Sequence, residues 1–316
     1  MDIPLLNIVH VTKFYSKHDT MPAVDNISFS IYKNRSVALI GESGCGKSTV
    51  AKLITGLEKP TNGEIQFQGK NIVSMQESQL RPLRKNIQLI FQCSKSVFNP
   101  NYTVGDSIKE VLCSHEHLSA QECTKRIDEI FDVVQLPKSL QNKYVSQLSG
   151  GQCQRANIAR SLILQPELLI CDEPLASLDY SIRHQILELL QEIKANTDIT
   201  YLLITHDLSN VKDLCEEVVV MYKGNVVERI PVQDNLEVMV KHPYSYDLFR
   251  SIPSPDPHHR SFIYEALRNY ESTESITEGC IYRNRCAYAN INKKCGVEKP
   301  VLKEIESMHY VACHKY

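Results

Sequence analysis

The chain has 316 residues, 42% hydrophobic and 23% charged, a composition typical of a globular protein with one large domain and an extension. A formal net charge of -2 gives no general electrostatic attraction for nucleic acid, so we expect no nucleic-acid partner. No stretch reaches the ~18–20 apolar residues that span a membrane, and residues 1–4 lack the features of a secretory signal. We therefore expect a protein that is neither secreted nor integral to a membrane.

Residues 4–40 alternate apolar and polar positions between turn residues, which predicts short β-strands. Tyr15 lies in the first of these segments, where its ring could stack on a nucleotide base. The alternative is an ordinary half-buried tyrosine of a strand. The mostly apolar residues 36–40 predict a buried strand at the end of this region.

A glycine-rich motif of the form G-x-x-x-x-G-K-[ST] follows this buried strand and precedes a helix predicted over residues 49–56. The backbone N–H groups of such a loop, and the N-terminus of its helix, bind phosphates. Lys47 is expected to contact the terminal phosphates, and the Ser48 hydroxyl to ligate Mg²⁺. The same surroundings are expected to favour the thiolate of Cys45. The predicted phosphate site consists of Gly41, Ser43, Gly44, Cys45, Gly46, Lys47, Ser48 and Thr49.

Further strands are predicted at residues 63–69 and 87–92, the second ending at Gln92, and the apolar spacing becomes helical from residue 104 to 147. This indicates an inserted helical subdomain over about residues 93–165. Ser149, Gly151 and Gln152 then open a helix that stops before Pro166. Their hydroxyl and backbone N–H groups could bind a second anion, and the alternative is a simple helix cap.

A buried strand at residues 168–171 ends in Asp172 and Glu173, and another at residues 201–205 is followed by His206. Strands that alternate with helices around a phosphate-binding loop predict an α/β P-loop NTPase fold with a mainly parallel sheet. In such sheets the active groups gather at the carboxyl ends of the strands, where Gln92 also lies. We expect Asp172 and Gln92 to hold Mg²⁺ together with Ser48, while Glu173 polarises the attacking water and His206 faces the γ-phosphate.

Prolines between residues 242 and 257 are expected to break regular structure, so we place a boundary near residue 250 and treat residues 251–316 as an extension. Seven of the eleven cysteines are scattered before residue 216, which suits reduced thiols. The extension has too few residues for a hydrophobic core of its own, and such short segments need a stabilising cross-link or bound metal. Zinc, an iron–sulfur cluster and unliganded thiols all stay open for its remaining cysteines. These are Cys280, Cys286, Cys295 and Cys313.

Taken in order, the motifs of residues 1–250 resemble those of the ATP-binding subunits of ABC transporters. The resemblance implies an ATP hydrolase with an N-terminal antiparallel β subdomain that binds ATP and Mg²⁺. It also implies a head-to-tail dimer with an identical or sibling subunit, in which Ser149, Gly151 and Gln152 of one chain close over the ATP held by Lys47 of the other. Further implied roles are adenine stacking by Tyr15, contact with the membrane subunits near Gln92, general-base catalysis by Glu173 and γ-phosphate contact by His206.

A narrower resemblance, to the importers of oligopeptides, dipeptides and nickel, rests on Asn99-Pro100, His242-Pro243-Tyr244 and the cysteine-bearing tail. It implies import of peptides or nickel, two transmembrane permease subunits, an extracellular solute-binding protein acting indirectly, and a peripheral location at the cytoplasmic face of the cell membrane. It also favours a [4Fe-4S] cluster on the four tail cysteines.

The sequence departs from this family at Cys93, Cys153 and residues 175–177. Loss of the usual serine at Ala176 puts one hydrogen bond across the dimer in doubt. Two other interpretations stay open: a soluble ABC-type ATPase that acts on DNA or ribosomes, and an ATPase whose tail senses metal or redox state. The first is disfavoured because the chain has one continuous cassette, with about 100 residues between Lys47 and Leu148.

Overall fold

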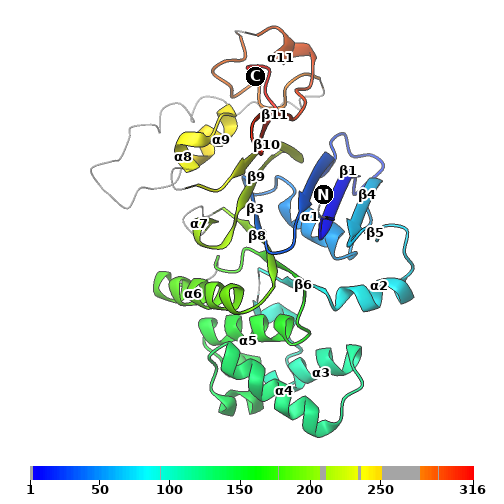
Figure 1. The fold of residues 1–316 in the computed structure, drawn as a ribbon, viewed down its shortest axis with the longest axis vertical. Helices are drawn as coiled ribbons and strands as arrows, with labels where there is room; N and C mark the ends of the chain where they lie inside the picture. The colour runs from blue at the N-terminus through cyan, green and yellow to red at the C-terminus, as the bar shows by residue number, and fades with distance from the viewer. Residues whose placement is uncertain are drawn as a thin grey trace.

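An antiparallel sheet of four strands, in the order β2-β1-β4-β5, forms the N-terminal part of the computed structural model (Figure 1). The structure describes residues 3–92, 94–176, 178–206, 211–233, 236–250, 278–290 and 292–316. Leu6 and Ile8 of the first strand are buried and pair with Ile31 and Phe29 of the second, which explains the alternating pattern of the sequence. The strands are β1 (Leu6–Lys13), β2 (Val24–Ile31), β4 (Asn62–Phe67) and β5 (Lys70–Asn71).

The main sheet has eight strands in the order β11-β12-β10-β9-β3-β8-β7-β6. The five strands from β9 to β6 are parallel, so the loops that follow them meet at one edge of the sheet. The other three strands are antiparallel and extend the opposite side. The strands are β3 (Val37–Ile40), β6 (Ile87–Ile90), β7 (Leu168–Asp172), β8 (Thr200–Thr205), β9 (Glu217–Tyr222), β10 (Asn225–Pro231), β11 (Lys303–Glu306) and β12 (His309–Val311).

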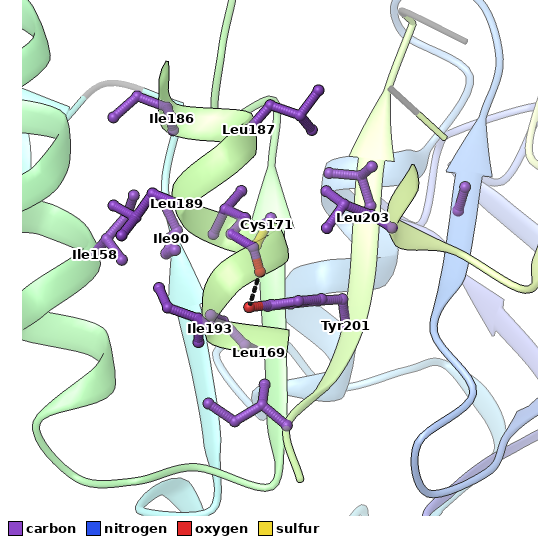
Figure 2. Close-up of a cluster of buried hydrophobic side chains, with 14 of the residues drawn as sticks. Ile90, Ile158, Leu169, Cys171, Ile186, Leu187, Leu189, Ile193, Tyr201 and Leu203 are labelled. Carbon is purple, nitrogen blue, oxygen red and sulfur yellow. Dashed lines mark hydrogen bonds between the residues drawn. The ribbon is translucent and has the colours of Figure 1, made fainter. Parts of the chain in front are cut away.

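Alternate residues of the parallel strands pack into two separate hydrophobic cores, one on each face of the sheet. Val37 and Leu39 pack on the side of α1 (Lys47–Ile54) and the N-terminal sheet, whereas Ala38 and Ile40 pack on the other side. The second side is covered by α5 (Gly150–Leu162) and α6 (Tyr180–Asn196). Figure 2 shows side chains of these two helices beside those of β7 and β8. Burial on both faces explains why these strands appear in the sequence as continuous apolar runs.

Helices α3 (Val104–His115) and α4 (Ala120–Val133) lie beside α5 at one end of the molecule (Figure 1), which confirms the inserted helical segment. Both begin at side-chain caps, Thr103 and Ser119, whose hydroxyls accept a backbone hydrogen bond three residues on. The other helices are α2 (Glu77–Arg84), α7 (Val211–Leu214), α8 (Leu236–Met239), α9 (Pro243–Arg250) and α11 (Lys294–Val297), with short 3-10 helices at Ser94–Val97, Lys138–Asn142 and Val145–Gln147.

One feature differs from the sequence-based expectation. Pro243 begins α9 instead of breaking regular structure, because the first helical position needs no backbone N–H donor. The tail is joined to the main core: Val311 pairs with Glu228 of β10, and Cys280 and Tyr282 belong to the larger buried cluster. Residues 251–277, where the extension was expected to begin, lie outside the described residues, as do Cys93 and Ser177. Among the described helices, none has the length and apolar character needed to cross a membrane.

Candidate active site

The loop between β3 and α1 requires glycine at two positions for steric reasons. Gly46 has a φ of 107°, and a Cβ atom there would lie 2.3 Å from the carbonyl oxygen of Ala23. A Cβ at Gly41 would lie 2.2 Å from the carbonyl oxygen of Met221. Gly44 has a φ of 79° with no atom within 4 Å of the added carbon, so only its backbone conformation favours glycine. The loop is thus folded tightly against the neighbouring backbone.

Lys47 is buried at the first position of α1. Its Nζ atom donates hydrogen bonds to the carbonyl oxygens of Gly41, over 2.8 Å, and Glu42, over 2.9 Å. The lysine side chain therefore folds back over its own loop, where two neutral carbonyl oxygens accept its hydrogen bonds. An anionic phosphate can replace these acceptors and form a stronger, charge-assisted hydrogen bond.

Tyr15 lies beside the start of α1. Its hydroxyl is 3.2 Å from the hydroxyl of Thr49, and the residue is 53% exposed. The Nζ atom of Lys13 lies 5.1 Å from the ring centroid. The exposed ring next to the phosphate-binding loop can stack on a base, and the alternative of a half-buried strand tyrosine does not describe its surroundings.

Ser48 and Asp172 bring two oxygen donors together, as a Mg²⁺ site requires. The Ser48 hydroxyl donates to Oδ1 of Asp172 over 3.2 Å. Burial, and to a lesser degree the charge of Glu173, raises the pKa of Asp172 above its usual value, against the opposing effects of Ser48 and Lys47. A carboxylate held in such surroundings gains from a neighbouring cation, so these residues fit the expected metal.

Glu173 joins the ends of three parallel strands. Its Oε2 atom accepts a hydrogen bond of 2.7 Å from Nε2 of Gln92, and its Oε1 atom lies 3.4 Å from Nδ1 of His206. Glu173 has a φ of 47°, unusual for a residue other than glycine, and its N–H group donates to the carbonyl oxygen of Ile204. Backbone strain of this kind is concentrated at functional sites. Gln92 itself lies two residues beyond β6, not inside the strand.

Cys45 does not have the expected reactive thiolate. Its side chain is buried, and burial raises the pKa of the thiol more than the neighbouring Lys47 lowers it. The expectation considered the local charge but not the loss of solvent.

Ser149, Gly151 and Gln152 lie at the start of α5, which Figure 1 places with α3 and α4, apart from α1. The Ser149 hydroxyl accepts a hydrogen bond from the Gln152 N–H group, and the Ser149 N–H group donates to Oε1 of Gln152. A Cβ atom at Gly151 would lie 2.8 Å from Cγ2 of Ile182, so glycine lets α5 approach α6. Within the described part of one chain, these residues form a helix cap and are not brought to Lys47.

Two residues that no sequence pattern indicates contact the phosphate-binding loop from the C-terminal part of the chain. The Glu42 N–H group donates to the Tyr244 hydroxyl over 2.9 Å. Nη1 of Arg285 lies 2.9 and 3.2 Å from the two carboxylate oxygens of Glu42. No local pattern indicates these contacts, which link residues 202 and 243 positions apart.

The four tail cysteines are neighbours. The Cys280 N–H group donates to the carbonyl oxygen of Cys295 over 2.9 Å. Burial, and to a lesser degree the charges of Cys295, Cys286 and Cys313, raises the pKa of Cys280 to about 11. No group of three or more His, Cys, Asp or Glu side chains within the described ranges is arranged to hold a metal ion.

Two family models match the chain. One, described as ABC transporter, matches residues 24–176, and the other, described as oligopeptide/dipeptide transporter, C-terminal region, matches residues 227–295. The second match includes three of the four tail cysteines.

Several curated relatives are similar to almost the whole chain. The oligopeptide transport ATP-binding protein OppF of Haemophilus influenzae is 38% identical over 307 residues, which cover 96% of this chain and 91% of the relative. OppF of Escherichia coli is 38% identical over 305 residues, with coverages of 96% and 90%. A putative peptide import ATP-binding protein of Brucella ovis is 34% identical over 313 residues, with coverages of 99% and 98%.

The solved structures that are similar to this chain are also ATP-binding cassettes. A dimeric, post-hydrolysis state of the ATP-binding cassette MJ0796 with bound ADP and Pi is 27% identical, with a TM-score of 0.66, and covers 72% of this chain and 99% of its own. The cassette cbiO1 of Clostridium perfringens, part of the ABC transporter complex cbiONQ, is 29% identical, with a TM-score of 0.64 and coverages of 72% and 88%.

Proposed function

The chain belongs to the ATP-binding proteins of ABC transporters that import peptides, and on this premise we propose that Glu173 drives ATP hydrolysis for uptake of an oligopeptide. The observation that carries the assignment is the position of Glu173, whose carboxylate is linked to Gln92 and lies beside His206 at the edge of the parallel strands. The phosphate-binding loop after β3 lies at the same edge.

Each residue of the site has a task in phosphoryl transfer. Lys47 exchanges its two carbonyl partners for the terminal phosphates of ATP, and Ser48 and Asp172, with the side-chain oxygen of Gln92, would hold Mg²⁺. The metal, when bound, neutralises charge on the phosphates. Glu173 accepts a proton from the attacking water while the hydrogen bond from Gln92 holds its carboxylate in place. His206, whose Nδ1 atom lies near the other carboxylate oxygen of Glu173, would contact the γ-phosphate.

The active form we propose is a head-to-tail dimer with an identical or sibling subunit. The cap formed by Ser149, Gly151 and Gln152 lies at the N-terminus of a thirteen-residue helix, where Ser149 and Gly150 are exposed, and the positive end of the helix dipole there suits a phosphate of the partner's ATP. The dimeric state of the solved cassette relative supports this arrangement. In the assembly, two transmembrane permease subunits would bind the dimer near Gln92 at the cytoplasmic face of the membrane, and an extracellular solute-binding protein would act through them. A nickel complex is the alternative solute.

For the tail we propose a [4Fe-4S] cluster held by Cys280, Cys286, Cys295 and Cys313. Two observations support it: Cys280 donates a backbone hydrogen bond to Cys295, and the other three cysteines all act on the pKa of Cys280. Since the four side chains are not arranged as a metal site in the described residues, the cluster would have to draw them together and displace their protons. Anaerobic purification is expected to yield brown protein with about four irons per chain. Cys286→Ser should lose the colour and still bind ATP, whereas Cys113→Ser, on α3, should keep it. A colourless preparation free of iron and zinc would reject a metal at this site.

The function as a whole is tested by purification from the native membrane. The expected result is co-purification with two hydrophobic permease subunits, and ATP hydrolysis that rises when peptide and its binding protein are added. ATP hydrolysis that responds to no peptide, by a protein that never co-purifies with membrane subunits, would reject the transport role while leaving the hydrolase in place.

A further inference from the structure

One arginine of the cysteine-bearing tail contacts the carboxylate of the phosphate-binding loop. Nη1 of Arg285 lies 2.9 Å from Oε1 and 3.2 Å from Oε2 of Glu42, so a single guanidinium nitrogen contacts both carboxylate oxygens. The side chains are 28% and 43% exposed, respectively. The pair is therefore partly shielded from solvent and joins segments that are far apart in the sequence.

Aromatic rings hold Arg285 in this position. Its guanidinium carbon lies 5.5 Å from the ring centroid of Tyr282 and 5.9 Å from that of Tyr222, distances at which a cation and a ring attract. The two rings meet edge to face with centroids 5.2 Å apart, and Tyr244 packs against both. The arginine thus approaches Glu42 from a rigid platform built by β9, α9 and the tail.

Glu42 is held at three points, and one of them is Lys47. The tail contacts its carboxylate through Arg285, Tyr244 accepts its N–H group, and its carbonyl oxygen accepts from Nζ of Lys47. A change in the position of Glu42 is therefore passed to the lysine that is expected to bind the phosphates.

We propose that Arg285 is a positioning residue for ATP binding, which neutralises the carboxylate of Glu42 and so lets the loop accept a polyanion. Without the arginine, Glu42 would present a free negative charge beside the triphosphate. Like charges at the edge of a protein repel through an intermediate dielectric and are screened by salt. The inference rests on the proposed ATP site and assigns to the tail an electrostatic role in nucleotide affinity.

A double-mutant cycle measures this role with a fluorescent ATP analogue as the probe and the dissociation constant as the readout. Arg285→Gln is expected to weaken binding by about three- to tenfold at low ionic strength, a range typical of one partly exposed charge pair. Glu42→Gln should bind at least as tightly as the wild type, because it removes the repelling charge. The double variant Arg285→Gln with Glu42→Gln should return to within about twofold of the wild type.

Two further measurements separate electrostatics from a general structural effect. The defect of Arg285→Gln should shrink as salt is raised, and Arg285→Lys, which keeps the cation, should restore most of the affinity. Lys299→Gln is the matched control: it removes another ion pair of the tail, with Asp25 of β2, and should leave the affinity unchanged.

Affinity unchanged in Arg285→Gln, or a double variant as weak as Arg285→Gln alone, would overturn the proposal. If Arg285→Gln does not fold, the affinities of Glu42→Gln and Arg285→Lys for the analogue still test the proposal. ATP-analogue binding by Glu42→Gln that is weaker than that of the wild type contradicts the proposed repulsion. Failure of the wild type to bind the analogue would instead reject the ATP site itself, so the two failures are distinguishable.

Discussion

Nε2 of Gln92 donates a hydrogen bond to Oε2 of Glu173 over 2.7 Å, and this bond connects the loop after β6 to the end of β7. The amide has a further N–H group and a carbonyl oxygen. Movement of the loop that carries Gln92 would therefore change the orientation of the carboxylate that we expect to accept a proton. Through this contact, a membrane partner bound near Gln92 could control hydrolysis.

Glu173→Gln keeps the shape of the side chain and removes the base. We expect the rate of ATP hydrolysis to fall by about 10²–10⁴ while ATP still binds, because general-base catalysis contributes a factor of this size. Phosphate release and size-exclusion chromatography with ATP are the measurements, and an ATP-dependent dimer should accumulate. Glu188→Gln, at an exposed carboxylate of α6, is the control and should hydrolyse ATP normally. Full turnover by Glu173→Gln would exclude Glu173 as the base.

Gln92→Ala removes the donor that orients Glu173. The hydrolysis rate at saturating ATP is expected to fall about tenfold with little change in ATP affinity, since a misplaced catalytic group lowers the rate more than binding. The control is Gln88→Ala, because this glutamine lies on β6, just before the loop that carries Gln92, and donates to the backbone carbonyl of Arg84 instead. Equal rates for the two variants would contradict a role for the Gln92–Glu173 contact.

Lys47→Ala removes the cation of the phosphate-binding loop. ATP affinity is expected to fall by about 10- to 100-fold, because hydrogen bonds to charged groups contribute about 1.5–3 kcal/mol. Equilibrium titration with a fluorescent nucleotide measures the loss. Lys52→Ala, at an exposed position of the same helix, should bind ATP almost as well as the wild type. Tight binding by Lys47→Ala would remove this lysine from the site.

Two glycines of the loop offer a matched pair of substitutions. Gly46→Ala places a carbon 2.3 Å from the carbonyl oxygen of Ala23, whereas Gly44→Ala meets no atom within 4 Å. We expect Gly44→Ala to cost about 1–2 kcal/mol for its left-handed backbone alone, and Gly46→Ala to cost more and to abolish ATP binding. Thermal unfolding and nucleotide titration test both; a Gly46→Ala variant that matches Gly44→Ala would show that the loop is less tightly packed.

His242 should make the fold sensitive to acid. Burial lowers its pKa from 6.5 to about 4, against the opposing charge of Glu228, so the unfolded chain binds a proton at pH values where the folded chain does not. Stability is therefore lost as the pH falls from about 6.5 towards about 4, by up to about 3 kcal/mol from this one group. The folded histidine accepts a hydrogen bond at Nδ1 from the Tyr244 N–H group.

Urea unfolding of His242→Gln between pH 7 and pH 4.5 measures this contribution. The variant should lose less stability over that interval than the wild type, while His184→Gln, at an exposed histidine of α6, should follow the wild type. A His242→Gln curve parallel to that of the wild type would mean that this histidine is not the acid-sensitive group.

The sequence by itself determined the parts that depend on local spacing. The strand, glycine loop and helix around Lys47 follow from an apolar run, turn residues and a helical period in continuous chain. Asp172 and Glu173 follow another apolar run, and the parallel pairing of β6, β7 and β8 then brings their ends to one edge. The grouping of Gln92, Glu173 and His206 was therefore predictable, because strand direction sets where each loop emerges.

Only the tertiary structure decided the rest, because those features depend on segments that meet through packing. Arg285 and Tyr244 reach Glu42 across 243 and 202 positions, and no period or motif encodes such a contact. The pKa of Cys45 depends on how deeply the loop is buried. Burial raises this pKa by more than the neighbouring Lys47 lowers it, and only the presence of Lys47 can be read from the sequence. The tail likewise is stabilised by the pairing of β12 with β10 and by side chains that pack into the main core. Both contacts join segments far apart in the sequence, so the position of the tail depends on the tertiary structure.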